Sequence, residues 1–386
     1  MTEPTEQPDW SQLPGDLVET IIHRWSTKLQ DFIHSRFVCK QWRSLPLPEF
    51  RQSLPWLVSP CKSKSASNPK AVGCNGNWHR ITDVTTAAAE IKNKKPRLQH
   101  VNLADGPRRV EVQCLGSAFG WLLLKEVRSP PPSWGPILCL MNPLTRNKIY
   151  LPQETTTGQG TCVPCCIARF LMSAAPTATK TEESITVVLL YQDVGDVGGG
   201  LAFCKLGWDE RWTLVPFHDH LPTNKVAEIV SWRGKIHVLC EDDGRVLAYD
   251  HLQPKFSLAF LAENSADLFN GERPCNYRLV VSPEGELILL ISHCESAGGR
   301  VKRFSIYRAK EDGRRWRWDA VGSIGDYALF FDSSCAVYVS VRDHPECRRD
   351  CVYYMENVYD LKMNEFVHRS GDGGRAVGNW ILPSSY

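Results

Sequence analysis

The stretch Arg278-Leu-Val-Val-Ser-Pro-Glu-Gly-Glu-Leu-Ile-Leu-Leu-Ile-Ser292 decides the fold of most of this chain. Two apolar runs flank Ser282-Pro-Glu-Gly285, and this arrangement predicts a β-hairpin. Similar short apolar runs continue from about Trp78 onward, separated by turn clusters such as Asp242-Asp-Gly244 and Glu311-Asp-Gly313. Because no convincing helical pattern interrupts them, we expect an all-β domain there.

An internal similarity narrows the choice among all-β architectures. Regular short strands over such a length are typical of a sandwich, a barrel or a propeller. Gly207-Trp-Asp-Glu-Arg-Trp-Thr-Leu-Val-Pro216 resembles Arg315-Trp-Arg-Trp-Asp-Ala-Val-Gly322, and both predict a strand that carries tryptophans. The two motifs lie roughly 100 residues apart, which favours a β-propeller in which their blades are two positions apart in the ring. The similarity does not fix the total number of blades.

Composition and charge restrict the class of protein. A chain of 386 residues suits two domains, and 42% hydrophobic residues are ample for a core. The net charge of +2 argues against nucleic-acid binding, and no apolar run approaches the length of a membrane span. Met1 to Pro8 is polar and acidic, unlike a signal peptide, so we expect the cytoplasm, the nucleus or both, with the 15 cysteines mostly reduced.

Residues from about Trp10 to Phe50 carry a helical pattern instead. Pro14 suits the first turn of a helix, and Asp16 complements the dipole at its start. Leu17, Ile21 and Trp25 then recur at helical spacing, and two further short helices are expected before Pro46. We therefore predict a helical module at 1–50, a linker at 51–77 and a β domain at 78–386.

The helical module resembles the F-box family in the order and spacing of its motifs. Leu13-Pro14, Asp16-Leu17, Ile21 and Val38-Cys-Lys-Gln-Trp-Arg43 carry the match, with Gly15 and Trp25 as mild departures. The resemblance implies a three-helix, all-α module that docks on the Skp adaptor and through it on a cullin. The adaptor-binding residues that it implies are Leu13, Pro14, Leu17, Ile21, Val38, Cys39 and Trp42. We expect two or three of them, Ile21 and Val38 among them, to be partly internal.

The β domain is similar to that of a plant F-box family long catalogued as a domain of unknown function. Leu115-Gly-Ser-Ala-Phe-Gly-Trp-Leu-Leu-Leu124 and Leu140-Met-Asn-Pro-Leu-Thr-Arg-Asn-Lys-Ile-Tyr-Leu-Pro152 carry the resemblance, which covers about Lys92 to Pro383. It implies a kelch-like propeller. We interpret the motif glycines as turn formers and Trp121 as a core residue, rather than as a chemical site.

The sequence offers no convincing catalytic, cofactor or metal site. Cys162 and Cys165 have zinc-ligand spacing, but Cys347 and Cys351 are too loosely spaced to complete the usual four ligands. His218-Asp-His220 fits a polar loop better than an acid–base site, and Lys92-Asn-Lys-Lys-Pro-Arg97 fits either solvated surface or a nuclear localisation signal.

The favoured function is therefore that of a non-catalytic adaptor. We predict a substrate-recognition subunit of an SCF-type ubiquitin ligase, in which the F-box docks on the adaptor and the propeller captures a target protein for ubiquitination. Two alternatives remain: a propeller that binds a small molecule or glycan, and a propeller-type hydrolase. Convergent, paired carboxylates in the structure would favour the hydrolase.

Overall fold

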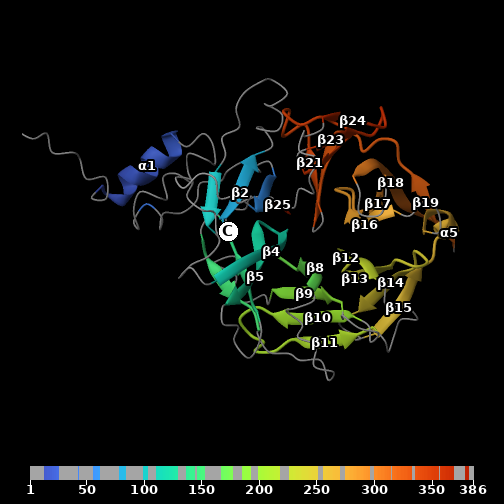
Figure 1. The fold of residues 1–386 in the computed structure, drawn as a ribbon, viewed down its shortest axis with the longest axis horizontal. Coiled ribbons are helices and arrows are strands. Elements are labelled where there is room, and N and C mark those ends of the chain that lie inside the picture. The colour runs from blue at the N-terminus through green and yellow to red at the C-terminus, as the bar shows by residue number, and fades with distance from the viewer. Residues whose placement is uncertain are drawn as a thin grey trace, which may run out of the picture.

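The structure, a computed structural model, is almost entirely β in the residues that it describes. It describes residues 13–25, 42, 55–60, 78–83, 99–102, 110–128, 136–143, 146–152, 167–176, 185–192, 199–217, 226–250, 255–269, 274–295, 300–313, 315–332, 335–355, 357–368 and 379–381. Within these ranges the strands form six sheets arranged in a ring, which is a β-propeller (Figure 1). The predicted all-β propeller is confirmed.

Four of the sheets are regular, with four antiparallel strands each in chain order. Their strands are β4 (Val110–Ala118), β5 (Trp121–Arg128), β6 (Ile137–Met141), β7 (Lys148–Tyr150); β8 (Ile167–Met172), β9 (Thr186–Tyr191), β10 (Gly200–Lys205), β11 (Thr213–Pro216); β12 (Val226–Trp232), β13 (Lys235–Cys240), β14 (Val246–Asp250), β15 (Lys255–Phe260); and β16 (Pro274–Val281), β17 (Leu287–Cys294), β18 (Val301–Asp312), β19 (Arg315–Ala320).

The fifth sheet is irregular. It contains β20 (Tyr327–Phe331), β21 (Ala336–Ser340), β22 (Cys351–Tyr354), β23 (Asn357–Asp360) and β24 (Glu365–His368). The strands lie in the order β21-β20-β22-β23-β24, and β20 pairs with β22 in parallel.

The sixth sheet closes the ring with strands from distant parts of the chain. It contains β1 (Trp56–Pro60), β2 (Trp78–Asp83), β3 (Gln99–Asn102) and β25 (Asn379–Ile381). Strand β25 pairs antiparallel with β1. Because β1 lies within 51–77, this part of the predicted linker is strand, and its backbone pairing extends the propeller before residue 78.

One strand of each sheet faces the centre of the ring. Contacts join β25 to β4, β4 to β8, β8 to β12, β12 to β16 and β16 to β21. These inner strands are the first strand of each regular sheet, so any side chain that leaves them toward the axis meets side chains of neighbouring blades. This arrangement positions the central polar network described below.

The turns confirm the prediction for Gly120 and Gly285, whereas Gly116 of the first motif lies within β4, next to a shift in register, and forms no turn. Phe119 and Gly120, at φ 48° and 78°, form the turn between β4 and β5, and Trp121 is 3% exposed in the core. The turn between β16 and β17 has Gly285 at φ 81°, whose N–H donates to the Ser282 carbonyl at 2.9 Å. A positive φ at these positions gives the twist that a tight hairpin needs.

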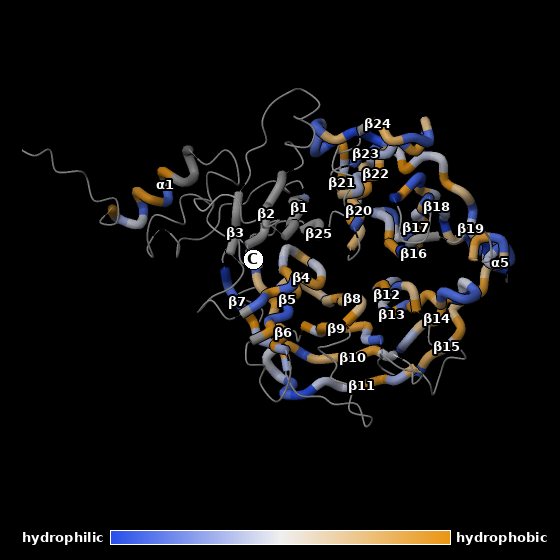
Figure 2. The backbone as a smooth tube through the Cα atoms, viewed as in Figure 1, coloured by the Kyte–Doolittle hydropathy of each residue, from blue (hydrophilic) through white to orange (hydrophobic). Residues whose placement is uncertain are grey.

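The core fills the spaces between adjacent blades. One cluster joins Leu123 and Leu140 of the β4–β7 sheet to Leu189 and Ala202 of the β8–β11 sheet. Figure 2 shows hydrophobic residues running along strands such as β9, with hydrophilic residues gathered at many of the connections. Burying a side chain of leucine size stabilises the fold by roughly 1.5–3 kcal/mol, so these interfaces hold the ring together.

The two tryptophan motifs occupy corresponding places in the ring. Trp212 directly precedes β11 and Trp318 lies in β19, and both are buried. Their sheets are separated by the β12–β15 sheet, so the predicted distance of two blades is confirmed. Each residue also ties its blade to the preceding one. The indole of Trp212 donates to the Pro152 carbonyl at 2.7 Å, and the backbone of Trp318 exchanges two hydrogen bonds with the Asn264 side chain.

The cysteines of the described residues are mostly buried thiols. Seven of them are reduced thiols, and Cys294 is disulfide-bonded. Burial raises the pKa of Cys204 and of Cys351 to about 12, so these thiols stay protonated at neutral pH. A protonated, buried thiol packs as a small apolar side chain and is a poor nucleophile.

Candidate functional site at the N-terminal helix and the propeller centre

Helix α1 (Gly15–Trp25) begins where the sequence predicts. The backbone N–H groups of Leu17 and Val18 donate to the Pro14 carbonyl, each at 3.1 Å, and Asp16 lies in the first turn. An acidic residue at this end of a helix interacts favourably with the dipole. The remaining helices of the predicted three-helix module fall outside the described residues, apart from the helical residue Trp42.

Some apolar side chains of helix α1 are buried in the protein, and others are exposed to solvent. Val18 is 0% exposed, Leu13 and Ile21 are half-buried, and Pro14 is exposed. Leu17 is 49% exposed, although a leucine would gain by burial. An exposed leucine beside an exposed proline at a helix start is a surface that a partner protein can cover.

Of the three remaining predicted adaptor-binding residues, the structure describes Trp42. Trp42 is 6% exposed and therefore lies in the protein interior. Val38 and Cys39 lie outside the described residues. Of the five predicted residues that the structure describes, Pro14 and Leu17 are the most accessible for docking.

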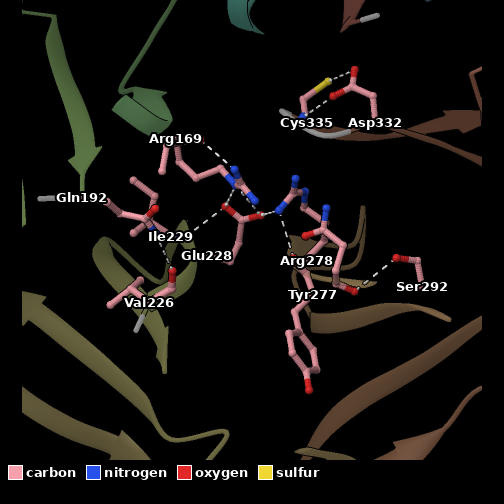
Figure 3. A network of polar contacts seen from close by, with 12 residues as sticks. Arg169, Gln192, Val226, Glu228, Ile229, Tyr277, Arg278, Ser292, Asp332 and Cys335 are labelled. Carbon is pink, nitrogen blue, oxygen red and sulfur yellow. Dashed lines mark hydrogen bonds and ion pairs between the residues drawn. The ribbon is translucent and has the colours of Figure 1, made fainter. Parts of the chain in front are cut away.

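A buried network of charges occupies the centre of the propeller (Figure 3). Its core is Glu228 of β12, which lies between Arg169 of β8 and Arg278 of β16. The Arg278 Nη1 group donates to Glu228 Oε2 at 2.7 Å, and Arg169 Nε approaches Glu228 Oε1 at 3.2 Å. The three residues therefore join the inner strands of three consecutive blades.

Backbone groups hold these side chains in place. Arg278 Nη1 also donates to the Tyr277 carbonyl at 3.0 Å, and Arg169 Nη1 donates to the Ala168 carbonyl at 2.7 Å. The Ile229 N–H donates to Glu228 Oε1 at 3.1 Å. Burial lowers the pKa of Arg169 from its usual value, and the neighbouring Glu228 carboxylate opposes that shift. A buried carboxylate needs such donors, because burying it without partners is costly.

A second polar group links the network to the fifth sheet. Asp332, which is 0% exposed, accepts the Cys335 N–H at 2.8 Å and faces the Cys335 thiol at 3.4 Å. The Ser117 hydroxyl of β4 contacts the Cys335 sulfur at 3.7 Å. Burial and the Asp332 carboxylate raise the pKa of Cys335 well above its usual range. The thiol is therefore protonated, and Ser117 of the predicted Gly-Ser motif has a structural contact.

Chemically, the centre is a matched set of charges. Arg169 and Arg278 contribute two positive charges, and Glu228 and Asp332 contribute two negative charges; Asp332 acts electrostatically on both Arg169 and the Cys335 thiol beside Arg278. Both oxygens of Glu228 already accept hydrogen bonds from the protein. The arrangement is suited to holding blades in register.

Sequence reasoning missed this network. None of its charged residues belongs to a recognisable motif, and they come from strands far apart in the chain. The one signal was Arg278 itself, a charged residue that opens the apolar run Leu279-Val-Val281 and is 1% exposed. Its partner could not be named without the ring geometry.

The other candidate residues do not form a site within the part of the chain that the structure describes. Cys347 and Cys351 are reduced thiols buried in an apolar cluster, and no group of three potential metal ligands occurs among the described residues. Cys162, Cys165, His218 and His220 lie outside those residues. In the described ranges, none of the helices has the length and apolar character of a membrane span.

Known proteins resemble this chain over most of its length. Residues 90–377 match the family model described as the KIB1-4 beta-propeller. The Arabidopsis thaliana protein At5g60060, which is named as an F-box protein, is 24% identical over 352 residues, covering 86% of this chain and 83% of its own. The F-box protein At2g26160 from the same plant is 22% identical over 370 residues, covering 92% and 97%.

Two further similarities are partial or distant. The Arabidopsis thaliana F-box/kelch-repeat protein At2g24250 is 42% identical over 60 residues, which cover 15% of this chain and 16% of that protein. The solved structure of the Dos1 propeller has a TM-score of 0.33 and 12% identity, covering 79% of this chain and 68% of that chain. The kelch-like character of the propeller stays a prediction. The family match spans most of the propeller strands, and the chain therefore belongs to the KIB1-4 beta-propeller family.

Proposed function

We propose that this protein is the substrate-recognition subunit of an SCF-type ubiquitin ligase. Residues 1–50 dock on the Skp adaptor, which binds a cullin, and the propeller captures a target protein. We expect the protein to act in the cytoplasm, the nucleus or both. The observation that carries the proposal is the exposed Leu17 on a helix of F-box-like sequence, ahead of a β-propeller whose relatives are named as F-box proteins.

In this function the chain contributes proximity and no bond chemistry of its own. Tethering a target beside a ubiquitin-charged enzyme raises the effective concentration of its lysines. The matched charges at the propeller centre support this proposal, because Glu228 is already held by Arg169 and Arg278. A rigid ring keeps the captured target at a fixed position relative to the adaptor.

The test is binding to a plant Skp adaptor, measured by size-exclusion chromatography of co-expressed proteins and by titration. We expect Leu17→Asp to weaken adaptor binding by at least about tenfold, because it removes apolar contact and buries a charge. Leu258→Asp is the matched control, since Leu258 is 59% exposed on β15 of the propeller. Both substitutions lie at exposed positions, so thermal unfolding should change little.

Two results would oppose the proposal. If the folded wild-type chain bound none of several Skp adaptors, the helical module would not dock as proposed. If Leu17→Asp and Leu258→Asp weakened binding equally, the contact surface would lie elsewhere.

A further inference from the structure

Cys294, the last residue of β17, forms a disulfide bond. Seven other cysteines of the described residues are reduced thiols, and five of those are buried. Cys294 is half-buried, so a reductant in solution can reach it more readily than it can reach the buried thiols. An oxidised cysteine at the end of a strand, in a chain whose other described cysteines are reduced, is a feature that the adaptor role does not explain.

The strand pairing indicates which cysteine is bonded to Cys294. Of the 15 cysteines in the chain, the partner is one of the seven that are neither Cys294 nor among the reduced thiols. Of those seven, Cys275 is the one whose backbone the structure describes, and it lies in β16, the strand that pairs with β17. It lies at the start of β16, which is the end of the β16–β17 hairpin where β17 stops at Cys294.

A shift in register brings these two positions closer together. Pro274 pairs with His293 and Asn276 pairs with Ser292, so Cys275 is the extra residue of a β-bulge. In a regular ladder, position 294 would be the diagonal neighbour of position 275, at about 7–8 Å between Cα atoms. A disulfide spans about 4.4–6.8 Å between Cα atoms. The bulge supplies the difference, because two residue steps along β16 match one step along β17.

We propose that Cys275 and Cys294 form a cross-strand disulfide that acts as a redox-sensitive clip at the start of β16. In the cytoplasm or the nucleus, where we expect the protein to act, the thiol pool reduces most disulfides, and those that form are usually transient or redox-sensing. Two β-strand cysteines that are brought together by a bulge, with one of them accessible to solvent, suit such a reversible bond.

Glutathione, a low-molecular-weight thiol, supplies the reducing equivalents. Its thiolate attacks one sulfur of the disulfide, which breaks the S–S bond, forms a mixed disulfide and releases the other cysteine as a thiolate. A second glutathione thiolate then attacks the mixed disulfide and releases the remaining cysteine. The two cysteine thiolates take up the two protons that the glutathione thiols gave up, so the products are two cysteine thiols and one glutathione disulfide.

The clip fastens the strand that carries Arg278. This residue lies in β16 three positions after Cys275, and it donates to Glu228 at 2.7 Å in the central network. Linking the ends of a loop of about 20 residues restricts the unfolded chain, so the oxidised form should be the more stable one. The pairing of β16 with β17 continues to Val281, and we therefore expect the reduced protein to stay folded.

The first test maps the bond in the full chain. The chain is purified without reductant, its thiols are blocked with N-ethylmaleimide under denaturing conditions, and the digested peptides are analysed by mass spectrometry. We expect a peptide pair that joins Cys275 to Cys294, and blocked thiols at the reduced positions Cys204 and Cys351. A bond from Cys294 to any other cysteine, or a blocked thiol at Cys294, would overturn the proposal.

The second test measures whether the bond is reversible. The folded chain is equilibrated with mixtures of reduced and oxidised glutathione, and the bridged fraction is determined by the same mapping. We expect the bridge to open in fully reduced glutathione and to form again when oxidised glutathione is added. A bridge that survived in fully reduced glutathione would be a permanent structural bond, which would rule out a redox-sensitive clip.

Thermal unfolding then measures the effect of the clip on stability. We expect reduction to lower the Tm of the wild type by roughly 6–12 °C. Cys294→Ser should have the Tm of the reduced wild type, with no further response to reductant. Cys114→Ser is the matched control, because Cys114 of β4 is a half-buried, reduced thiol, and this variant should keep the full response. Equal responses of Cys294→Ser and Cys114→Ser, or a wild-type Tm that ignores reductant, would refute the proposed clip.

Discussion

Replacing Glu228 by glutamine should destabilise the propeller severely. The carboxylate lies 2.7 Å from Arg278 and 3.2 Å from Arg169, and the Glu228 and Arg278 side chains are 6% and 2% exposed. Glu228→Gln keeps the shape but leaves two buried guanidinium groups with Asp332 as the remaining carboxylate among the described residues of the network. Removing one partner of a buried ion pair costs about 3–5 kcal/mol, because the other charge is left uncompensated.

The assay is urea and thermal unfolding followed by tryptophan fluorescence. At roughly 2–4 °C per kcal/mol for a large domain, the expected drop in Tm is about 6–20 °C. Glu263→Gln is the matched control, because the Arg315–Glu263 pair is 78% and 52% exposed and such pairs contribute about 0–1 kcal/mol.

A double variant separates charge balance from shape. Adding Arg278→Met to Glu228→Gln leaves Arg169 opposite Asp332, so the buried charges balance again. We therefore expect the double variant to be more stable than Glu228→Gln alone, although an arginine has been lost. The explanation by charge balance would be wrong if Glu228→Gln lowered the free energy of unfolding by less than about 1 kcal/mol. It would also be wrong if the double variant were less stable than Glu228→Gln alone by several kcal/mol more.

Two further substitutions test local features. His237 is buried against Trp232, and burial lowers its pKa to about 4 from 6.5, so the unfolded chain takes up a proton between these pH values and the folded one does not. The contribution of neutral His237 to the free energy of unfolding is complete above pH 6.5 and is lost as the pH falls toward 4, by up to about 3 kcal/mol. His237→Gln should lack this part of the pH dependence. The reasoning would be contradicted if the free energy of unfolding changed with pH equally in the variant and the wild type. Gly244→Ala should cost roughly 2–5 kcal/mol in urea unfolding, because φ is +70° and the new Cβ would clash with the Phe269 ring. Gly313→Ala, at φ +63° with no atom within 4 Å, should cost only about 1–2 kcal/mol, and equal losses would refute the clash.

Much of the propeller could be predicted because its strands are specified locally. The two apolar runs of Arg278–Ser292 were predicted as a hairpin, and they lie in β16 and β17. Turn chemistry is equally local, as Ser282-Pro-Glu-Gly285 shows. The short helix α5 (Ser265–Phe269) was missed, because five residues give too little periodicity to detect.

What the sequence could not supply is pairing between distant segments. Strand β1 lies where a linker was predicted, because its partner β25 comes from the other side of the whole propeller sequence. The Arg169–Glu228–Arg278 network has a similar origin: each residue alone is an ordinary charged side chain, and the packing of three consecutive blades around the centre brings them together. The helix α1 could be predicted from its motif, but the burial of Trp42 could not.

The pairing of β1 with β25 also bears on synthesis. A ribosome must make every other strand of the propeller before residues 379–381 can take their place beside β1. Until then the edge of β1 that pairs with β25 is open, and an open strand edge can pair with another chain. A premature stop before residue 379 would yield a product that keeps α1 but cannot close its ring, and we expect it to compete for the adaptor without presenting a target.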